Sequence, residues 1–320
     1  MTIQVHYENG VPVAAQTAFN SVISIYDSLF SNPVTVSIDV QFGTTGLGGS
    51  STLVAPISYS RWTAAMGVDS AANPGNQFLS DGLASLPAND PLVADNGSGN
   101  VTVTAANLKA LGFSLTYPPS DPNGYDSILT FTNTPNMFEY NGVATASRYD
   151  FMNVAEHELD EALGIGSALT FLGNNVAIPA GTNFYAEDYF RYSGNGTRSI
   201  STDPNATAYF SYNGGATNVA QFNQDHNAGG NTSADRNDWI YGNPTTGNPA
   251  GCPAAAPGPY IQDAIGCPSG AIPLTTGSPE FKVLSTLGWN PAVPEPGTVV
   301  LITAGLLAIR QFRRRRNSAQ

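Results

Sequence analysis

Charged side chains are scarce in this chain of 320 residues, in which Lys and Arg number 12, Asp and Glu number 24, and the four types together make up 11%. Five of the cationic residues lie within 310–316, and every acid lies at or before Glu295. The part before that tail therefore sets seven cationic residues against 24 acids, a formal net charge of −17. A body this acidic repels polyanions, which excludes nucleic-acid binding and adsorption to anionic membrane surfaces.

Cysteine is nearly absent, since Cys252 and Cys267 are the only two. They flank a loop rich in Pro, Ala and Gly. Outside the cytoplasm we expect them to form one disulfide, which closes a short loop and is worth about 3 kcal/mol in the chain-entropy model. Two thiol ligands of a metal ion are the alternative, although the chain has no further cysteine and the nearest His is remote in sequence.

Histidine is also scarce, with 3 in the chain, and one of them lies in the most informative stretch, Val154 to Ser167. Residues four apart share a helix face, which places His157, Glu161 and Gly164 together. In the HExxH motif, two histidines at this spacing bind zinc and the Glu after the first polarises a water molecule. Glu158 occupies that Glu position, and the apolar side that would pack into a core consists of Ala155, Leu159 and Ala162.

This stretch resembles the metzincin pattern HExxHxxGxxH of zinc proteases, with Val-Ala before the His and Ala-Leu-Gly after it. It differs at Glu161 and Ser167, where the family has its second and third His, and no Met follows Met152 to form a Met-turn. A carboxylate oxygen is a suitable zinc ligand at about 2.0–2.2 Å, so Glu161 can replace an imidazole without changing the helix. The resemblance implies Zn²⁺ bound by His157 and Glu161, with Glu158 as the catalytic base.

A third zinc ligand must come from later in the chain. Catalytic zinc sites have three protein ligands, and Ser167 stands where the third His is expected. The candidates are Asp188 first, His226 second and Glu187 third. Other zinc-protease clans take their third ligand from a carboxylate downstream of the helix, which favours Asp188 by resemblance.

Acidic residues crowd the same stretch. Glu156, Glu158, Asp160 and Glu161 lie within six residues with no Lys or Arg among them. Glu156 and Asp160 form a like-charge pair four residues apart that costs ~0.2–0.5 kcal/mol in a helix. A bound divalent cation would relieve this repulsion. The alternative is a solvated acidic helix in which the His-Glu pair arose by chance.

The end of the chain has three parts: the Pro-containing segment Val293–Gly297, an apolar run over Thr298–Ile309 and the basic segment Arg310–Arg316. This order resembles the PEP-CTERM sorting signal of Gram-negative bacteria, in which an exosortase removes the tail as the protein reaches the cell surface. Spanning a bilayer takes about 20 apolar residues, so the shorter run suits a transient membrane anchor. The arginines would stay in the cytoplasm and leave 1–292 on the far side. A buried core helix is the alternative interpretation of the apolar run.

The start of the chain does not show the export signal that such sorting requires. Residues 1–8 have neither a basic n-region nor an apolar h-region. We therefore expect the true start of the protein to lie upstream.

The pattern of the remaining residues predicts an α+β fold with a mixed sheet. Alternation predicts strands over 3–7 and 34–42, and a helix over 13–30 lies between them. A further strand is expected over 126–132, with short helices near 60–66, 105–111 and 280–287. The glycine-rich segment 43–51 is expected to be a turn region, because it lacks the Lys-Ser/Thr ending of a phosphate loop.

The order of these elements is that of zincin domains, so we expect a zincin-like domain over 1–290 and a sorting signal over 291–320. By the same resemblance, Ile128–Phe131 would be the edge strand that pairs with extended substrate. After the HE-containing helix the chain is expected to be loop-rich to about residue 279. The segment 222–241 has a composition that could hold Ca²⁺, with solvated turns as the alternative, and its acids are Asp225, Asp235 and Asp238.

These features predict an exported zinc metallopeptidase that acts on a peptide or protein substrate through a metal-activated water and is sorted to the cell surface. Its other partner would be a sorting protease of the exosortase type. The alternative function is a non-catalytic surface or matrix protein on a zincin scaffold. The spatial relation of His157, Glu161 and the candidate third ligands distinguishes the two.

We predict that Cys252 and Cys267 are joined in the exported protein. Mass spectrometry of peptides digested without reduction should give one linked peptide that separates into two after reduction. Two free thiols in exported protein would contradict the prediction.

Overall fold

The computed structural model describes residues 1–43, 46–117, 124–143, 145, 147–227, 234–240, 260–264, 266, 268 and 273–292. The two cysteines lie outside the described residues, as does the predicted membrane segment 298–309. Within the described ranges the chain is α+β, with several sheets and six α-helices.

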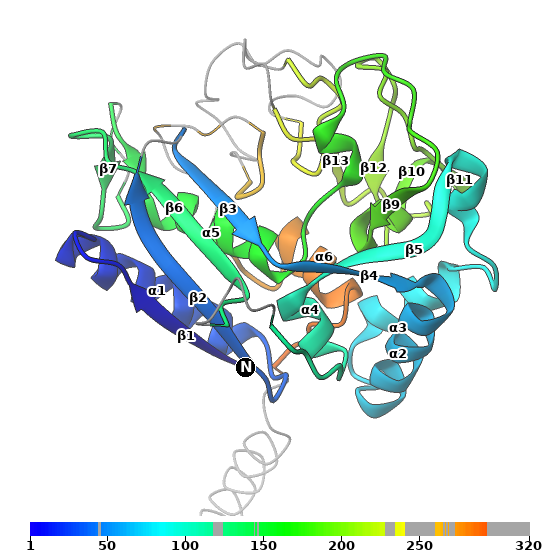
Figure 1. Ribbon diagram of the computed structural model, residues 1–320, viewed down its shortest axis with the longest axis horizontal. Helices are drawn as coiled ribbons and strands as arrows, with labels where there is room; N and C mark the ends of the chain where they lie inside the picture. Colours follow the sequence, from blue (N-terminus) through cyan, green and yellow to red (C-terminus); the bar gives the residue numbers. More distant parts are fainter. Residues whose placement is uncertain are drawn as a thin grey trace, which may run out of the picture.

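A four-stranded mixed sheet lies beside the longest helix (Figure 1). The strand order is β1-β2-β6-β3, in which β1, β2 and β6 are parallel and β3 runs antiparallel to β6 at one edge. One face of β2 is apolar and fully buried through Val36, Ile38 and Val40. The strands are β1 (Thr2–Tyr7), β2 (Thr35–Gly43), β3 (Gly48–Thr52) and β6 (Ser127–Thr132).

Two helices pack into the core formed by this sheet. Helix α1 (Val13–Leu29) ends before Pro33 and buries Ala15, Ala18, Phe19, Val22 and Tyr26, which recur at helical spacing. Helix α5 (Phe151–Leu163) contains the HE sequence. It begins at Asp150, whose side chain accepts a hydrogen bond from the Met152 N–H at 2.9 Å, and ends at Gly164, whose φ of 140° favours glycine.

The rest of the described chain forms smaller sheets and short helices. One sheet has the order β4-β5-β9, another β11-β10-β12-β13, and β7 pairs with β8. These strands are β4 (Val54–Ser58), β5 (Gly97–Thr104), β7 (Phe138–Glu139), β8 (Tyr149–Asp150), β9 (Thr182–Tyr185), β10 (Arg191–Gly194), β11 (Thr197–Arg198), β12 (Tyr209–Phe210) and β13 (Ala220–Gln221). The helices are α2 (Tyr59–Ala72), α3 (Gln77–Ser85), α4 (Ala105–Ala110) and α6 (Pro279–Thr286), with 3-10 turns η1 (Pro91–Asp95), η2 (Ala168–Phe171) and η3 (Ala186–Phe190).

The predicted N-terminal strand, helix and strand are confirmed as β1, α1 and β2, and the predicted strand over 126–132 is confirmed as β6. The prediction of an edge role for Ile128–Phe131 is wrong, because β6 pairs with β2 on one side and β3 on the other. The edge strand beside β6 is β3, which overlaps the segment 43–51 predicted as a turn region. Glycine weakens strand propensity, but pairing with β6 along five residues outweighs it here.

Helix α5 is attached to distant parts of the chain by buried hydrogen bonds. The hydroxyl of Tyr26 in α1 lies 2.6 Å from Asp160 Oδ1 and 3.1 Å from the Glu156 carbonyl oxygen. At the other end of α5, Trp289 Nε1 donates to the Leu163 carbonyl at 2.9 Å. Burial raises the pKa of Asp160 well above its usual range, and the nearby Glu280 raises it further. The Tyr26 hydroxyl thus supplies the buried Asp160 carboxyl group with a hydrogen bond.

We predict that Tyr26→Phe lowers the free energy of unfolding by about 1–3 kcal/mol, because it leaves a buried carboxyl group without its partner. Urea denaturation followed by circular dichroism measures this. Tyr7→Phe is the matched control, since the Tyr7 hydroxyl bonds the exposed Asn20 side chain and its loss should cost under about 0.5 kcal/mol. Equal stability of Tyr26→Phe and wild type would contradict the prediction.

Candidate metal centre

Helix α5 brings His157 and Glu161 together on one face, as their spacing predicts. The distance from His157 Nε2 to Glu161 Oε1 is 3.9 Å. Both side chains are about four-fifths buried, so little of either is exposed to water. The pair therefore forms the wall of a partly enclosed polar site.

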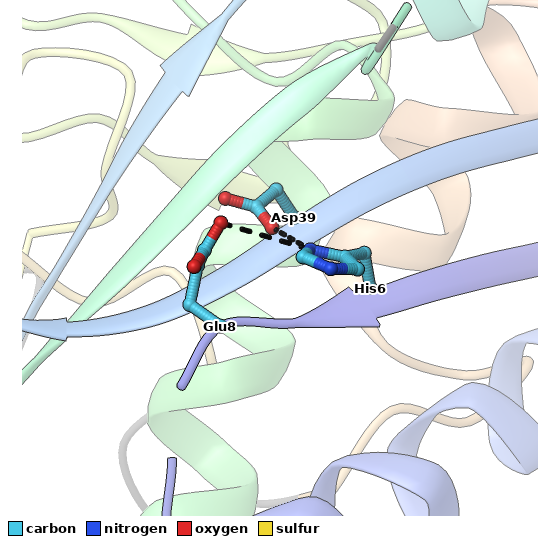
Figure 2. A group of neighbouring side chains, drawn as sticks. All are labelled: His6, Glu8 and Asp39. Carbon is cyan, nitrogen blue, oxygen red and sulfur yellow. Dashed lines mark hydrogen bonds and ion pairs between the residues drawn. The ribbon is translucent and has the colours of Figure 1, made fainter. Parts of the chain in front are cut away.

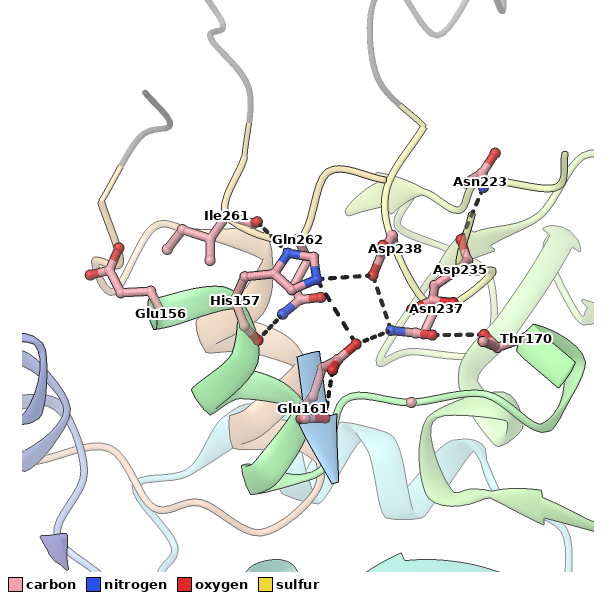
Figure 3. Close-up of polar contacts among 12 residues, drawn as sticks. Glu156, His157, Glu161, Thr170, Asn223, Asp235, Asn237, Asp238, Ile261 and Gln262 are labelled. Atoms are coloured by element: carbon pink, nitrogen blue, oxygen red, sulfur yellow. Dashed lines mark hydrogen bonds and ion pairs between the residues drawn. The ribbon is translucent and has the colours of Figure 1, made fainter. Parts of the chain in front are cut away.

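The residue that completes the group is Asp238, which lies in the segment 234–240. Asp238 Oδ1 lies 3.8 Å from His157 Nε2. One ligand atom from each of His157, Glu161 and Asp238 lies within 4.8 Å of the others. Figure 3 shows the three side chains turned toward one another, with Asn237 between the two carboxylates. Their separation is compatible with a single cation.

The orientation of the His157 ring is set by its other nitrogen. Nδ1 lies 2.9 Å from the Ile261 carbonyl oxygen, which can only accept, so Nδ1 is the donor of this hydrogen bond and Nε2 is the ring nitrogen that faces the two carboxylates. The Gln262 side chain donates a hydrogen bond to the His157 backbone carbonyl oxygen at 2.6 Å, so it contacts the same turn of α5. This is the arrangement of a metal-ligating histidine.

Polar neighbours also orient the two carboxylates. Ser50 of the edge strand β3 donates to Glu161 Oε2 at 2.7 Å. Asn237 Nδ2 lies 3.4 Å from Glu161 Oε1 and 3.0 Å from Asp238 Oδ1, and Asn237 Oδ1 accepts from Thr170 at 2.8 Å. These contacts leave Glu161 Oε1 and Asp238 Oδ1 facing His157.

Glu158 is buried between α5 and β3. A Cβ atom at position 48 would overlap its carboxyl group, so a larger residue at that point of β3 would displace the Glu158 side chain. Burial raises the pKa of Glu158 well above its usual range, and Glu161, which shares a hydrogen bond with it, raises it further. A hydrogen bond between two carboxyl groups requires one of them to hold a proton.

Negative charge accumulates around the group. Burial raises the pKa of Asp238 well above its usual range, with further contributions from Asp235, Glu161 and Glu158. Burial also raises the pKa of Asp235 to about 6, again assisted by Glu161. A divalent cation bound among these carboxylates would offset their mutual repulsion.

Two buried arginines hold Asp238 in place. Arg236 donates to the backbone carbonyls of Gln224 at 3.1 Å and Leu169 at 2.9 Å. Arg191 donates to the Arg236 carbonyl at 2.7 Å, and its guanidinium lies 4.0 Å from the centre of the Phe222 ring. These bonds join the 234–240 segment to η2 and β10, which fixes Asp238 opposite α5.

The other predicted ligands have different partners. Asp188 accepts hydrogen bonds from Ser167 Oγ at 2.5 Å, from the Ala168 N–H at 2.9 Å and from the Tyr185 N–H at 3.0 Å. Glu187 accepts from the Gly166 N–H at 2.8 Å. Among the described residues, neither of these acids nor His226 belongs to the group around His157. Asp188 ties η3 to the chain that leaves α5.

Asp238 therefore takes the place of Asp188 and His226 as the candidate third ligand. The sequence pattern indicates Asp238 only as part of a segment with a composition suited to Ca²⁺. It gives no signal for Asn237, Thr170 or Ser50. No spacing signal links these residues to His157, because their proximity arises from the packing of distant segments.

No helix within the described ranges combines the length and the apolar character needed to cross a membrane.

Comparison with known proteins identifies the end of the chain. Residues 292–316 match the model of the PEP-CTERM protein-sorting motif, as the sequence of the tail predicted. No curated protein and no solved structure matches the chain. The motif indicates recognition by an exosortase-type sorting protease. The chain is thus an exported protein that is sorted to the cell surface.

Proposed function

We propose that this surface-sorted protein is a metal-dependent hydrolase of the peptidase type, with a divalent cation held by His157, Glu161 and Asp238. The observation that supports it best is the convergence of His157 Nε2, Glu161 and Asp238 within 4.8 Å. The hydrogen bond from His157 Nδ1 to the Ile261 carbonyl adds to this, since it leaves Nε2 as the ring nitrogen that faces the carboxylates.

The donor set favours zinc over calcium. Ca²⁺ takes six to eight oxygen ligands, whereas an imidazole nitrogen with two carboxylates suits Zn²⁺ and related transition metals. Three protein ligands also match the number in catalytic zinc sites. The proposal therefore keeps Zn²⁺ as the cofactor and assigns the third ligand to Asp238.

Each residue then has a chemical role. His157, Glu161 and Asp238 would hold the ion, which would supply Lewis-acid chemistry at a substrate carbonyl and lower the pKa of a water molecule. Glu158, next to His157 on α5, is the candidate general base and would accept the proton of the attacking water once its own carboxyl is ionised. Asn237, Ser50 and the Ile261 carbonyl orient the ligands, which keeps the site preorganised.

The edge strand offers a means of aligning an extended peptide. Strand β3 pairs with β6 on one side, and in the sheet's strand order it is terminal. Its Ser50 touches Glu161 and its Gly48 adjoins Glu158, so an extended peptide that lay along β3 would pass the candidate site. We also propose that the fold is zincin-like, and the antiparallel edge strand β3 beside α5 supports this.

One observation favours the non-catalytic alternative. The carboxyl groups of Glu158 and Glu161 share a hydrogen bond, which is a way of satisfying two buried acids with a proton instead of a metal ion. A protein that uses its acids in this way would be a surface scaffold without hydrolytic activity. Metal occupancy and activity separate the two functions.

We predict that His157→Ala and Asp238→Asn each hold one equivalent of zinc less than wild type at matched free zinc, because each removes a ligand. Metal analysis after gel filtration measures this. Asn237→Ala should retain the site with about 10–100-fold weaker affinity, since it removes only an orienting contact.

The matched control for Asp238→Asn is Asp225→Asn. Asp225 lies in the same acidic segment, and its Oδ1 accepts hydrogen bonds from the Asn174 side chain and the Asn227 N–H, which an asparagine Oδ1 can also accept. This variant should keep the wild-type zinc content. Equal zinc content in wild type, His157→Ala and Asp238→Asn would overturn the proposed centre.

We further predict that Glu158→Gln keeps its zinc and loses hydrolysis of an unfolded protein substrate by about 10²–10⁴-fold, because the amide cannot accept a proton. Proteolysis is compared at equal zinc occupancy. Wild-type protein that is fully metallated but inert over a wide pH range, beside an active Glu161→His variant, would instead identify the chain as a non-catalytic scaffold.

A further inference from the structure

A second cluster of metal-ligating side chains lies on the four-stranded sheet, on strands β1 and β2. It consists of His6, Glu8 and Asp39, which Figure 2 shows turned toward one another. One ligand atom from each lies within 4.8 Å of the others. None of these residues takes part in the site on α5.

Strand pairing places the three side chains on one face. In the parallel register of β1 and β2, His6 lies directly beside Asp39. Glu8 is two residues beyond His6, and its N–H donates to the Val40 carbonyl at 2.9 Å, so it continues the alternation of β1 and points to the same side. The cluster is therefore preorganised by backbone hydrogen bonds on two adjacent strands.

The geometry differs from that of a loose surface ion pair. The Asp39 side chain is only 6% exposed, although it lies on the polar face of β2. The His6 ring stacks on Tyr125, with ring centres 5.8 Å apart and planes at 22°. A buried acid and a stacked imidazole lose little further freedom when they bind a ligand, which lowers the entropic cost of binding.

The atom separations suit a small divalent ion. His6 Nδ1 lies 2.7 Å from Asp39 Oδ1 and 3.8 Å from Glu8 Oε1. Two tetrahedral ligands at about 2.1 Å from zinc lie about 3.4 Å apart, a value between these two. Movements of well under 1 Å in the exposed His6 and Glu8 side chains would equalise them.

The charges of His6, Glu8 and Asp39 also favour a bound cation. Within the described ranges, the ion pairs of Glu8 and Asp39 are both made with His6. One imidazolium cannot neutralise two carboxylates, and a neutral imidazole leaves both charges in place.

We propose that His6, Glu8 and Asp39 form a second divalent-cation site, of the zinc class, on the polar face of the sheet. One imidazole and two carboxylates match the ligand preferences of Zn²⁺ rather than those of Ca²⁺ or Mg²⁺. With three protein ligands at an accessible face, the remaining coordination position is open to water or to a donor from another molecule. The inference is independent of the function proposed for α5.

The chain's three histidines allow a direct test by zinc titration calorimetry at pH 7.5 on the full chain, after removal of metal with EDTA. We expect His6→Ala to bind one equivalent less than wild type, and His6→Ala combined with His157→Ala to bind two fewer. His226→Ala is the matched control and should equal wild type, since His226 belongs to neither cluster. Circular dichroism checks that each variant is folded.

Asp39→Asn provides a second variant that keeps the size of the side chain, and it should also lose the equivalent lost in His6→Ala. Zinc binding that is equal in wild type, His6→Ala and Asp39→Asn would overturn the second site, whatever happens at His157. Loss in His6→Ala together with no effect of His157→Ala would support the second site while the α5 centre fails. Any zinc held by Cys252 and Cys267 is common to all these proteins and cancels in the differences.

Discussion

The candidate centre depends on one constraint, the fixed position of the 234–240 segment opposite α5. A helix can place His157 and Glu161 side by side, but it cannot supply a ligand from across the site. That ligand is Asp238, and the buried guanidinium of Arg236 holds its segment against backbone carbonyls of η2 and of residue 224. Burying an arginine is costly unless its donors are satisfied, so these carbonyl partners make the arrangement specific.

Several acidic side chains in and around the candidate centre are buried. Asp160 and Glu158 on α5 and Asp238 opposite it are buried, and their pKa values are raised chiefly by that burial. The chain contains few cations, and those near the site are directed at carbonyl oxygens instead of these acids. Protons or bound cations are what remain to neutralise them, which connects the acidic composition to the metal-dependent chemistry we propose.

Local patterns predicted the elements next to the site well. The alternation of β2 and the apolar stripe of α1 are strong periodic signals, and both elements form where expected. The edge strand β3 was missed because its Gly and Ser residues signal a turn, and only pairing with β6 makes them a strand. The expected ligand role of Asp188 rested on resemblance to other zinc-protease clans, and the structure shows Asp188 accepting three hydrogen bonds that close the chain around η3.

The sequence by itself determined three properties of this protein: an acidic, cation-poor body, a helix that presents His157 and Glu161 on one face, and a sorting motif over 292–316. These are local properties, set by composition, by helical spacing or by contiguous residues. The tertiary structure alone decided the candidate third ligand, the identity of the edge strand and the meeting of His6 with Asp39. The two groups of ligands join residues at least 33 positions apart in the sequence. The identity of the edge strand depends on which strands become neighbours. No periodicity in the sequence indicates either kind of long-range relation.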